Sequence, residues 1–302
     1  MRASHNMSWI QVSVAASSSN YQLVEETLLS LGAQAITYKD AADKPILEPR
    51  PGETPLWHDA IITGLFDDRL KPDILREQIR QQLDDDSLAI DIASLPDQDW
   101  TRTWMDTFKP MCFGERLWVC PRHVEPPEPQ AVNLHLDPGL AFGTGTHPTT
   151  SLCLRWLDGH VLRRPDYRRV LDYGCGSGIL AIAALLLGAE HADCVDIDEQ
   201  ALQSTRDNAA NNLVLHQIST CRPEELEAGS EYDLVLANIL SGPLTELAPT
   251  LAQHCHPGSN IVLSGILHDQ AESVRNAYAE YFDITTTETL EDWVLLHGKR
   301  KI

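Results

Sequence analysis

The pattern of apolar and polar residues divides this chain of 302 residues into two regions of different periodicity. Up to residue 95, short segments that alternate apolar and polar positions lie between two stretches with apolar residues at helical spacing. Alternation is typical of strands, and a spacing of three to four residues is typical of helices. The order strand-helix-strand-strand-helix-strand predicts a small ferredoxin-like α+β domain over residues 1–95. Strands are expected at 9–14, 35–38, 61–66 and 88–92, and helices at 20–31 and 72–83.

A connecting segment over residues 96–130 follows this domain. Within it, Trp100, Trp104 and Phe108 recur at helical spacing on an expected helix at 97–111, so their rings form one stripe. Such a stripe most often packs in a core or between domains; the alternative is a surface that contacts a substrate. In either case we expect this helix to link two domains.

From residue 131 onward, apolar runs alternate regularly with amphipathic stretches. This alternation predicts a doubly wound, Rossmann-like α/β sheet of parallel strands. Only a short turn near 289–292 separates the last two expected strands, which predicts an antiparallel pair at one edge. Strands are expected at 168–172, 192–196, 214–218, 232–237, 260–264, 282–288 and 292–297.

The most informative segment of this region is a glycine turn between a strand and a helix. Asp172 is followed by Gly174, Gly176 and Gly178, and then by an apolar run at 179–187. Glycines let the backbone approach a ligand closely, and the next helix points its positive end at that ligand. The spacing differs from the dinucleotide fingerprint G-x-G-x-x-G, and an acid here would repel a pyrophosphate. S-adenosylmethionine carries a sulfonium and an ammonium group but no phosphate, so Asp172 favours it over NAD. The remaining alternative is an ordinary tight turn.

A second acid supports this interpretation. Asp196 ends the expected strand at 192–196, and an acid at this place in a strand-helix-strand unit accepts hydrogen bonds from ribose hydroxyls. Asp198 is expected to cap the next helix, at 199–212. The two acids, Asp172 and Asp196, together favour S-adenosylmethionine as the cofactor.

A loop rich in glycine and threonine, at 136–150, precedes the first helix of this region. Thr149 or Thr150 is expected to cap a helix at 151–157. Because the loop, which includes Thr146, lies before the first strand of the sheet, it can fold over the cofactor as a lid. The alternative is an ordinary capped loop.

An apolar strand at 232–237 delivers Asn238 to the carboxyl end of the sheet, where open α/β sheets bind ligands. The side-chain carbonyl of Asn238 and the next backbone carbonyl can accept hydrogen bonds from a substrate nitrogen and direct its lone pair at a methyl group. Asn238 is therefore the candidate catalytic residue, and the expected reaction is methyl transfer to an amine. The alternative is an asparagine that only ends a strand. His147 is a candidate general base, although a lone histidine before proline is more often structural.

Composition narrows the classes of partner. The formal net charge is -21 and the isoelectric point is about 4.8, which opposes binding to a phosphate backbone. The same acidity favours a basic partner, or serves only solubility. The seven cysteines form no C-x-x-C pair, so we expect no metal site, no disulfide framework and a cytoplasmic location. No apolar run approaches the roughly 18 residues of a membrane span, so no membrane association is expected.

With these motifs, the chain resembles the family of ribosomal protein L11 methyltransferases over nearly its whole length. The resemblance departs from the family pattern at Ser241, where alanine is expected, and in the first six residues, which have no counterpart. The segments that carry it are 7–11, 51–54, 100–105 and 113–118, and most specifically 136–150, 174–187 and 238–240.

The resemblance implies a class I methyltransferase domain over 131–302 and an N-terminal domain that recognises the ribosomal protein. It implies methylation of lysine side chains and of the N-terminal α-amine, with S-adenosyl-L-methionine as methyl donor. The family's cofactor contacts carry over to Thr150, Gly174, Asp196 and Asn238, and the motifs themselves add Thr146, Asp172 and Gly176. Two alternatives compete with this interpretation. A nucleic-acid methyltransferase would need a basic face, and a sensor of S-adenosylmethionine would lack a productive amine site.

Overall fold

The computed structural model describes residues 9–42, 57–85, 88–95, 108–136, 145–161 and 167–302, apart from the side chains of residues 286 and 287. The chain divides into two compact units, Met1–Thr103 and Trp104–Ile302. The expected helix at 97–111 falls largely outside the described residues; its last residue, Met111, begins a strand instead.

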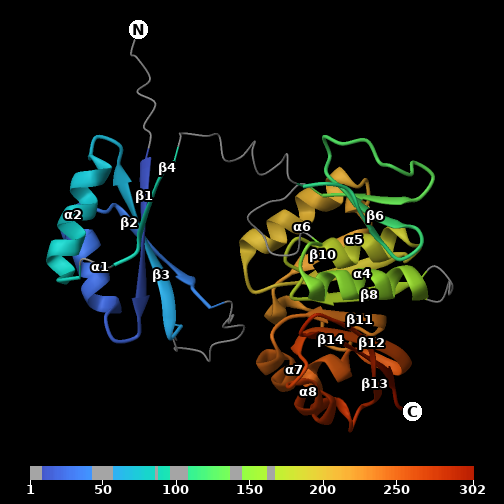
Figure 1. Ribbon diagram of the computed structural model, residues 1–302. Helices are drawn as coiled ribbons and strands as arrows, with labels where there is room; N and C mark the ends of the chain where they lie inside the picture. The colour runs from blue at the N-terminus through green and yellow to red at the C-terminus, as the bar shows by residue number, and fades with distance from the viewer. Residues whose placement is uncertain (1–8, 43–56, 86–87, 96–107, 137–144, 162–166) are drawn as a thin grey trace. The chain divides into compact units, whose positions relative to one another are not determined.

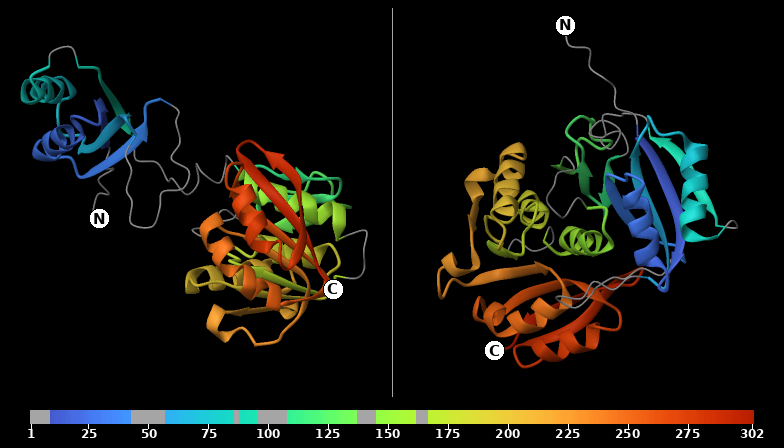
Figure 2. Two further views of the ribbon diagram at one scale, coloured as in Figure 1. Left: turned by 90° about the horizontal axis from the view of Figure 1, so that it is seen from below. Right: turned by 90° about the vertical axis from the view of Figure 1, so that its left-hand side faces the viewer.

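The first unit is a four-stranded antiparallel sheet with two helices on one face (Figures 1 and 2). The strand order is β2-β3-β1-β4, which confirms the ferredoxin-like arrangement. The elements are β1 (Trp9–Ser17), α1 (Tyr21–Ser30), β2 (Ala35–Asp40), β3 (Asp59–Asp67), α2 (Pro72–Leu83) and β4 (Ile90–Leu95).

Alternate residues of the central strands form the core of this unit. Val12 and Val14 of β1 are fully buried and share one cluster with Leu28 of α1 and Ile79 of α2. The intervening residues of β1, such as Gln11, lie on the opposite face and stay partly exposed. The sequence pattern of period two therefore reports a sheet covered by helices on one face only.

The second unit is built on a seven-stranded sheet in the order β10-β9-β8-β11-β12-β14-β13. The first five strands in this order are parallel, and β14 lies antiparallel between β12 and β13. This confirms the doubly wound sheet with a terminal antiparallel pair. The strands are β8 (Arg169–Tyr173), β9 (His191–Val195), β10 (Ile218–Cys221), β11 (Tyr232–Asn238), β12 (Cys255–Leu267), β13 (Phe282–Leu290) and β14 (Trp293–Arg300).

Helices cover both faces of this sheet (Figure 1). Successive residues of one strand enter different cores, as Leu234 packs with the helices of one face and Val235 with those of the other. This explains the continuous apolar runs of the central strands. On one face lie α4 (Pro148–His160), α5 (Ile179–Leu186) and α6 (Glu199–Asn211), and on the other α7 (Ser241–Gln253) and α8 (Ala271–Tyr278).

A separate three-stranded sheet, β5-β6-β7, belongs to the same unit. Its strands are β5 (Met111–Phe113), β6 (Leu117–Cys120) and β7 (Val132–His135). The carboxylate of Asp158, on α4, accepts hydrogen bonds from the backbone N–H groups of Glu115 and Leu117 in and after the turn between β5 and β6. A Cβ at Gly114 would collide with that carboxylate, so only glycine allows this close approach.

Two local predictions were wrong. The strand expected at 214–218 is instead a 3-10 turn, Leu215–Gln217, and β10 begins only at Ile218. The apolar run misled because Leu213, with a positive φ of 63°, and Leu215 are both exposed in the turn that ends α6.

The helix expected at 151–157 begins earlier, at Pro148, and neither Thr149 nor Thr150 caps it. The cap is His147, whose side chain accepts from the Thr149 N–H. Proline suits the first helical position because its missing N–H and fixed φ cost nothing there.

Candidate active site

The predicted site residues lie at the carboxyl ends of β8, β9 and β11 and at the start of α4. From β8 the chain proceeds outward to β9 and β10 and then returns to β11 on the other side of β8. This is the topological switch point, the place where the connections leave in opposite directions and where open α/β sheets bind ligands in a crevice. Gly174 follows β8, and Asn238 ends β11.

The glycine turn adopts left-handed backbone conformations at each glycine. The φ angles of Gly174, Gly176 and Gly178 are 77°, 54° and 76°, which residues with a Cβ rarely adopt. The N–H of Gly174 donates to the carbonyl of Val195 on β9 at 2.7 Å. A Cβ at Gly174 would lie 2.3 Å from Cγ2 of Ile239. The turn is therefore packed directly against the residue that follows Asn238.

Asp172 lies beneath this turn and is only 1% exposed. Its Oδ2 accepts from the N–H of Ala181 in the first turn of α5 at 3.1 Å. Burial raises the pKa of Asp172 to about 7, the hydrogen bond from Ala181 opposes the rise, and the charge of Asp196 adds to it. In this structure Asp172 fixes the start of α5, and a cation above the turn would stabilise its ionised form.

Asp196 holds the same turn from the end of β9. Its Oδ2 accepts from the N–H of Gly176 at 2.9 Å, and its Oδ1 accepts from the N–H of Asp198 at 3.0 Å. Each carboxylate oxygen keeps a second lone pair, so both can still accept from a pair of hydroxyls. Asp198 caps α6, as expected, by accepting from the N–H of Gln200.

Ile197, the residue after Asp196, was not predicted from the sequence to belong to the site. Ile197 is 78% exposed, and it continues the chain from the acid at the mouth of the crevice. An exposed apolar side chain next to this acid offers a surface for a flat ring. The available signal was a large apolar residue between two acids, at 196–198.

Asn238 and Thr150 come together across the site. The amide nitrogen of Asn238 donates to Oγ1 of Thr150, which is fully buried, at 3.2 Å. Asn238 is paired in the sheet with Ser264 of β12, whose hydroxyl donates to the carbonyl of Thr149 at 3.1 Å. The start of α4 is thus tied to the ends of two strands, and the side-chain carbonyl of Asn238 takes no part in its bond to Thr150.

A second glycine, missed from the sequence, encloses the residue after Asn238. Gly265 has a φ of 83°, and a Cβ there would lie 2.2 Å from the carbonyl oxygen of Ile239. The register of β12 shifts at this place. A glycine inside an apolar strand pattern is the signal that could have found it.

Thr146 and His147 lie at the start of α4. Thr146 is exposed. Nδ1 of His147 lies 2.7 Å from Oγ1 of Thr149, and its ring meets the ring of Trp293 edge-on at 5.0 Å. Burial lowers the pKa of His147, although the charge of Glu291 opposes this. These contacts give His147 a structural role at the cap. The loop expected to act as a lid falls, over 137–144, outside the described residues.

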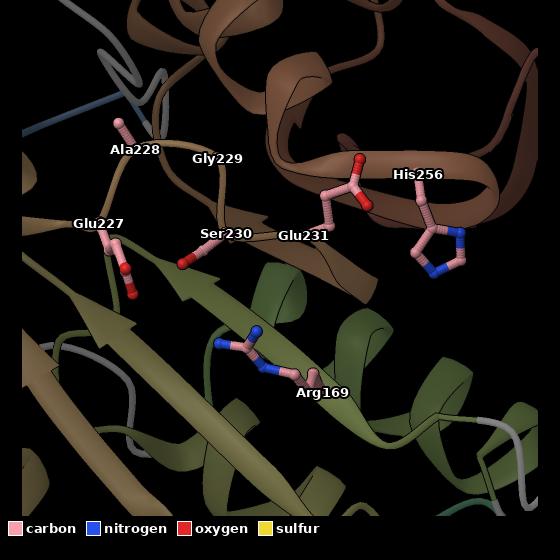
Figure 3. Close-up of a pocket in the computed structure, with 7 residues that line it drawn as sticks. All are labelled: Arg169, Glu227, Ala228, Gly229, Ser230, Glu231 and His256. Carbon is pink, nitrogen blue, oxygen red and sulfur yellow. The ribbon is translucent and has the colours of Figure 1, made fainter.

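A surface hollow of about 490 Å³ lies at the opposite end of the sheet (Figure 3). Arg169, the first residue of β8, and His256, near the start of β12, line it with the loop residues 227–231. The hollow is thus at the amino ends of the strands, away from every predicted site residue.

Within the described residues, no group of three or more His, Cys, Asp or Glu side chains is arranged to hold a metal ion. Nor does any helix in the described parts of the chain have the length and apolar character to cross a membrane.

A sheet of this strand order, with one antiparallel strand near its edge and a glycine turn and acids at its switch point, defines a class I methyltransferase. Enzymes of this class use S-adenosylmethionine as methyl donor. The family model described as "Ribosomal protein L11 methyltransferase (PrmA)" matches residues 8–301.

Curated relatives agree with that match. The chain is 52% identical over 300 residues to a ribosomal protein L11 methyltransferase of Chromohalobacter salexigens, covering 97% of this chain and 99% of the relative. It is 50% identical over 297 residues to that of Hahella chejuensis, with the same coverage. The crystal structure of a ribosomal protein L11 methylase from Lactobacillus delbrueckii superposes with a TM-score of 0.58 at 30% identity, covering 65% of this chain and all of that one. The chain therefore belongs to the ribosomal protein L11 methyltransferase family.

Proposed function

We propose that this protein transfers methyl groups from S-adenosylmethionine to lysine side chains and the N-terminal α-amine of ribosomal protein L11, at the crevice between β8 and β11. One observation carries the proposal. Asn238, at the carboxyl end of β11, is oriented by Thr150 directly beside the glycine turn. Membership of the family supplies the class of reaction and the substrate.

The side chains around the turn fit a cationic cofactor that has no phosphate. The segments 172–178 and 196–198 contain acids and no basic residue. We assign the ribose hydroxyls to Asp196 and close backbone contacts to Gly174 and Gly176. We assign to Asp172 a charge that favours the sulfonium and ammonium groups. Thr146 and Thr150 would bound the donor from the start of α4. No metal is needed for this chemistry.

The acceptor amine must reach the site in its neutral form. Loss of a proton from a lysine with a pKa near 10.4 costs roughly 4–5 kcal/mol at pH 7. Burial beside a cation lowers that pKa and reduces the cost. The bond to Thr150 fixes the side-chain amide of Asn238, so its carbonyl oxygen can accept from the amine N–H and orient the lone pair. Alignment of this kind contributes on the order of 7–11 kcal/mol, so we expect no indispensable general base.

We propose that the first unit, Met1–Thr103, recognises the protein substrate. Its sheet has both helices on one face, and the other face carries partly exposed residues of β1 and β3, including Gln11, Thr63 and Leu65. The formal net charge of -21 favours encounter with a protein that presents ammonium groups. It opposes direct binding to nucleic acid. A substrate that is a ribosomal protein and seven free cysteines support a cytoplasmic location.

The test is methyl transfer from radiolabelled donor to purified ribosomal protein L11, with ribosomal RNA in a parallel reaction. We expect label in the protein, at lysines and at the N-terminus, and none in the RNA. The wild-type protein without L11 is the control for automethylation. Label that appears only in RNA would contradict the proposal. Donor binding without transfer to either substrate would instead indicate a sensor.

A further inference from the structure

One side of α6 carries polar residues that bond outside their own helix. Thr205, Asn208 and Asn212 are spaced three and four residues apart, so they share one face of the helix and its end. Each donates a hydrogen bond to a backbone carbonyl of another segment. Their partners are Gly176, Ser177 and His135.

Thr205 forms a hydrogen bond to the middle glycine of the turn. It is fully buried, and its hydroxyl donates to the carbonyl of Gly176 at 3.1 Å. The N–H of the same glycine donates to Asp196 at 2.9 Å. Both backbone polar groups of Gly176 are therefore held, one by the acid that precedes α6 and one by a hydroxyl within α6. A Cβ at Gly178 would lie 2.7 Å from Cγ2 of Thr205, so the third glycine permits this packing.

Asn208 and Asn212 continue these contacts toward the C-terminal end of α6. Nδ2 of Asn208 donates to the carbonyl of Ser177 at 2.9 Å. Oδ1 of Asn212 accepts from the N–H of His135 at 2.7 Å, and its Nδ2 donates to the carbonyl of His135 at 2.8 Å. Asn212 thus pairs with the end of β7 and fixes the last turn of α6 against it. The helix connects the glycine turn to a second, independent element of the fold.

The three glycines of the turn have no side chains with which to hold their own conformation. Left-handed glycines have wide conformational freedom, and a ligand that orders a free loop binds more weakly because that freedom is lost on binding. We propose that Thr205 and Asn208 are positioning residues that pre-organise the glycine turn for the methyl donor, with Asn212 anchoring the helix that carries them. The inference rests on the glycine turn being the donor site proposed above.

The decisive variant is Thr205→Val, which removes the hydroxyl and keeps the shape of the side chain. Donor affinity is measured by isothermal titration calorimetry well below the unfolding temperature. We expect S-adenosylmethionine to bind roughly 5- to 10-fold more weakly, the effect of one lost hydrogen bond. The kcat at saturating donor and L11 should stay near the wild-type value, so KM for the donor rises alone. Thr205→Ser keeps the hydroxyl and should restore most of the affinity.

Two further variants keep the inference testable if Thr205→Val does not fold. Asn208→Ala alters a partly exposed residue and should weaken donor binding about 3- to 5-fold. Asn212→Ala should do the same and should speed hydrogen exchange of the His135 amide. Asn211 is an exposed asparagine of the same helical turn. Asn211→Ala is therefore the matched control, and it should leave donor affinity and hydrogen exchange of the His135 amide unchanged.

A purely structural role would lower the unfolding temperature of these variants and leave donor affinity as in the wild type. That result, in the folded Thr205→Val and Asn208→Ala proteins, would overturn the inference. Failure of the wild-type protein itself to bind S-adenosylmethionine would overturn the proposed donor site, and this inference with it.

Discussion

The two ends of the seven-stranded sheet are both lined by charged and polar residues, but these residues have different partners. Near the amino ends, each acid has a basic side chain as a partner, and Asp233 also accepts from the backbone N–H groups of Arg168 and Arg169. Asp233 accepts from the imidazole of His256 at 3.0 Å, and Asp193 accepts from the guanidinium of Arg169 at 3.1 Å and from the hydroxyl of Tyr232 at 2.8 Å. The guanidinium of Arg169 also lies over the ring of Tyr232.

At the carboxyl ends, the acids accept from backbone N–H groups instead. Asp172 bonds to Ala181, and Asp196 to Gly176 and Asp198. Such bonds fix the backbone but leave each carboxylate without a compensating positive side chain in these contacts. The basic side chains that line the hollow, Arg169 and His256, are therefore already paired with acids, whereas the carboxyl ends present charge that a cationic ligand can match. The pairing of charged side chains therefore distinguishes the two ends of the sheet more clearly than the size of a cavity does.

The largest expected effect is on catalysis at the carboxyl end. Asn238→Ala removes the acceptor that we propose orients the amine, and we expect kcat to fall about 100-fold, the cost of a misplaced reactant. The measurement is steady-state methyl transfer with donor and L11 both saturating, and circular dichroism checks that the variant is folded. Near-wild-type kcat in this variant would remove Asn238 from the catalytic machinery.

The next effect concerns donor binding. Asp196→Ala removes both proposed ribose acceptors and one anchor of Gly176, so we expect the Kd for S-adenosylmethionine to rise on the order of 10- to 100-fold. The matched change at the other end of the sheet is Asp193→Ala, which breaks contacts to Arg169 and Tyr232. It should lower stability and leave the Kd unchanged. Equal losses of affinity in both variants would abolish the contrast between the two ends.

A pH effect on stability tests the buried acid. The folded pKa of Asp172, about 7, lies above the unfolded value of 3.8. The unfolded state therefore binds fewer protons between these values, and stability falls as pH rises through that window. Asp172→Asn removes this slope, so wild type should lose about 1 kcal/mol relative to the variant between about pH 5.5 and 6.5. Urea unfolding of the ligand-free proteins at each pH measures this difference in stability. If the stability of wild type and of Asp172→Asn changed with pH in parallel, Asp172 would not be buried as described.

The smallest effect is expected at the amino end, from the pair His256–Asp233. The hydrogen bond to Asp233 raises the pKa of His256. Burial opposes ionisation of Asp233, but the N–H groups of Arg169 and Arg168 and the imidazole of His256 outweigh it and lower its pKa. The pair therefore stabilises the fold at pH values between the usual pKa of an aspartate and the raised pKa of His256.

His256→Ala should remove less than about 1 kcal/mol of stability at about pH 5.5, because the pair is partly exposed and screened. Above the raised pKa of His256, wild type and variant should converge. Methyl transfer should be the same in both at either pH. A loss of activity in His256→Ala would mean that the hollow in Figure 3 takes part in function.

Much of the fold could be predicted from the sequence because its signals are local. The period-two pattern of β1 and the apolar run of β11 each report burial of a strand on one face or on both. The predictions failed where local signals compete. The apolar residues around Leu215 resemble a strand but lie in an exposed turn, and Pro148 starts α4 before the threonines that could have capped it.

The site was predictable only in part, for a similar reason. Asp196 and Asn238 end apolar strands, so their place at one edge of the sheet follows from the sequence. The contacts of Thr205 and Gly265 do not, because they depend on which loop a helix or strand end meets after the layers have packed. The sequence gives no direct measure of such long-range neighbours.

The confinement of Ile239 has a consequence for how this enzyme can change. The residue lies between Gly174, in the donor turn, and Gly265, at the end of β12, and a methyl group added at either glycine would overlap it. Ile239 is also joined by a peptide bond to Asn238. A side chain at either position would therefore displace Ile239, which lies between the proposed donor site and the proposed acceptor site. Affinity for the donor and selection of the acceptor cannot be tuned separately here, and variation in specificity must arise from residues outside this contact.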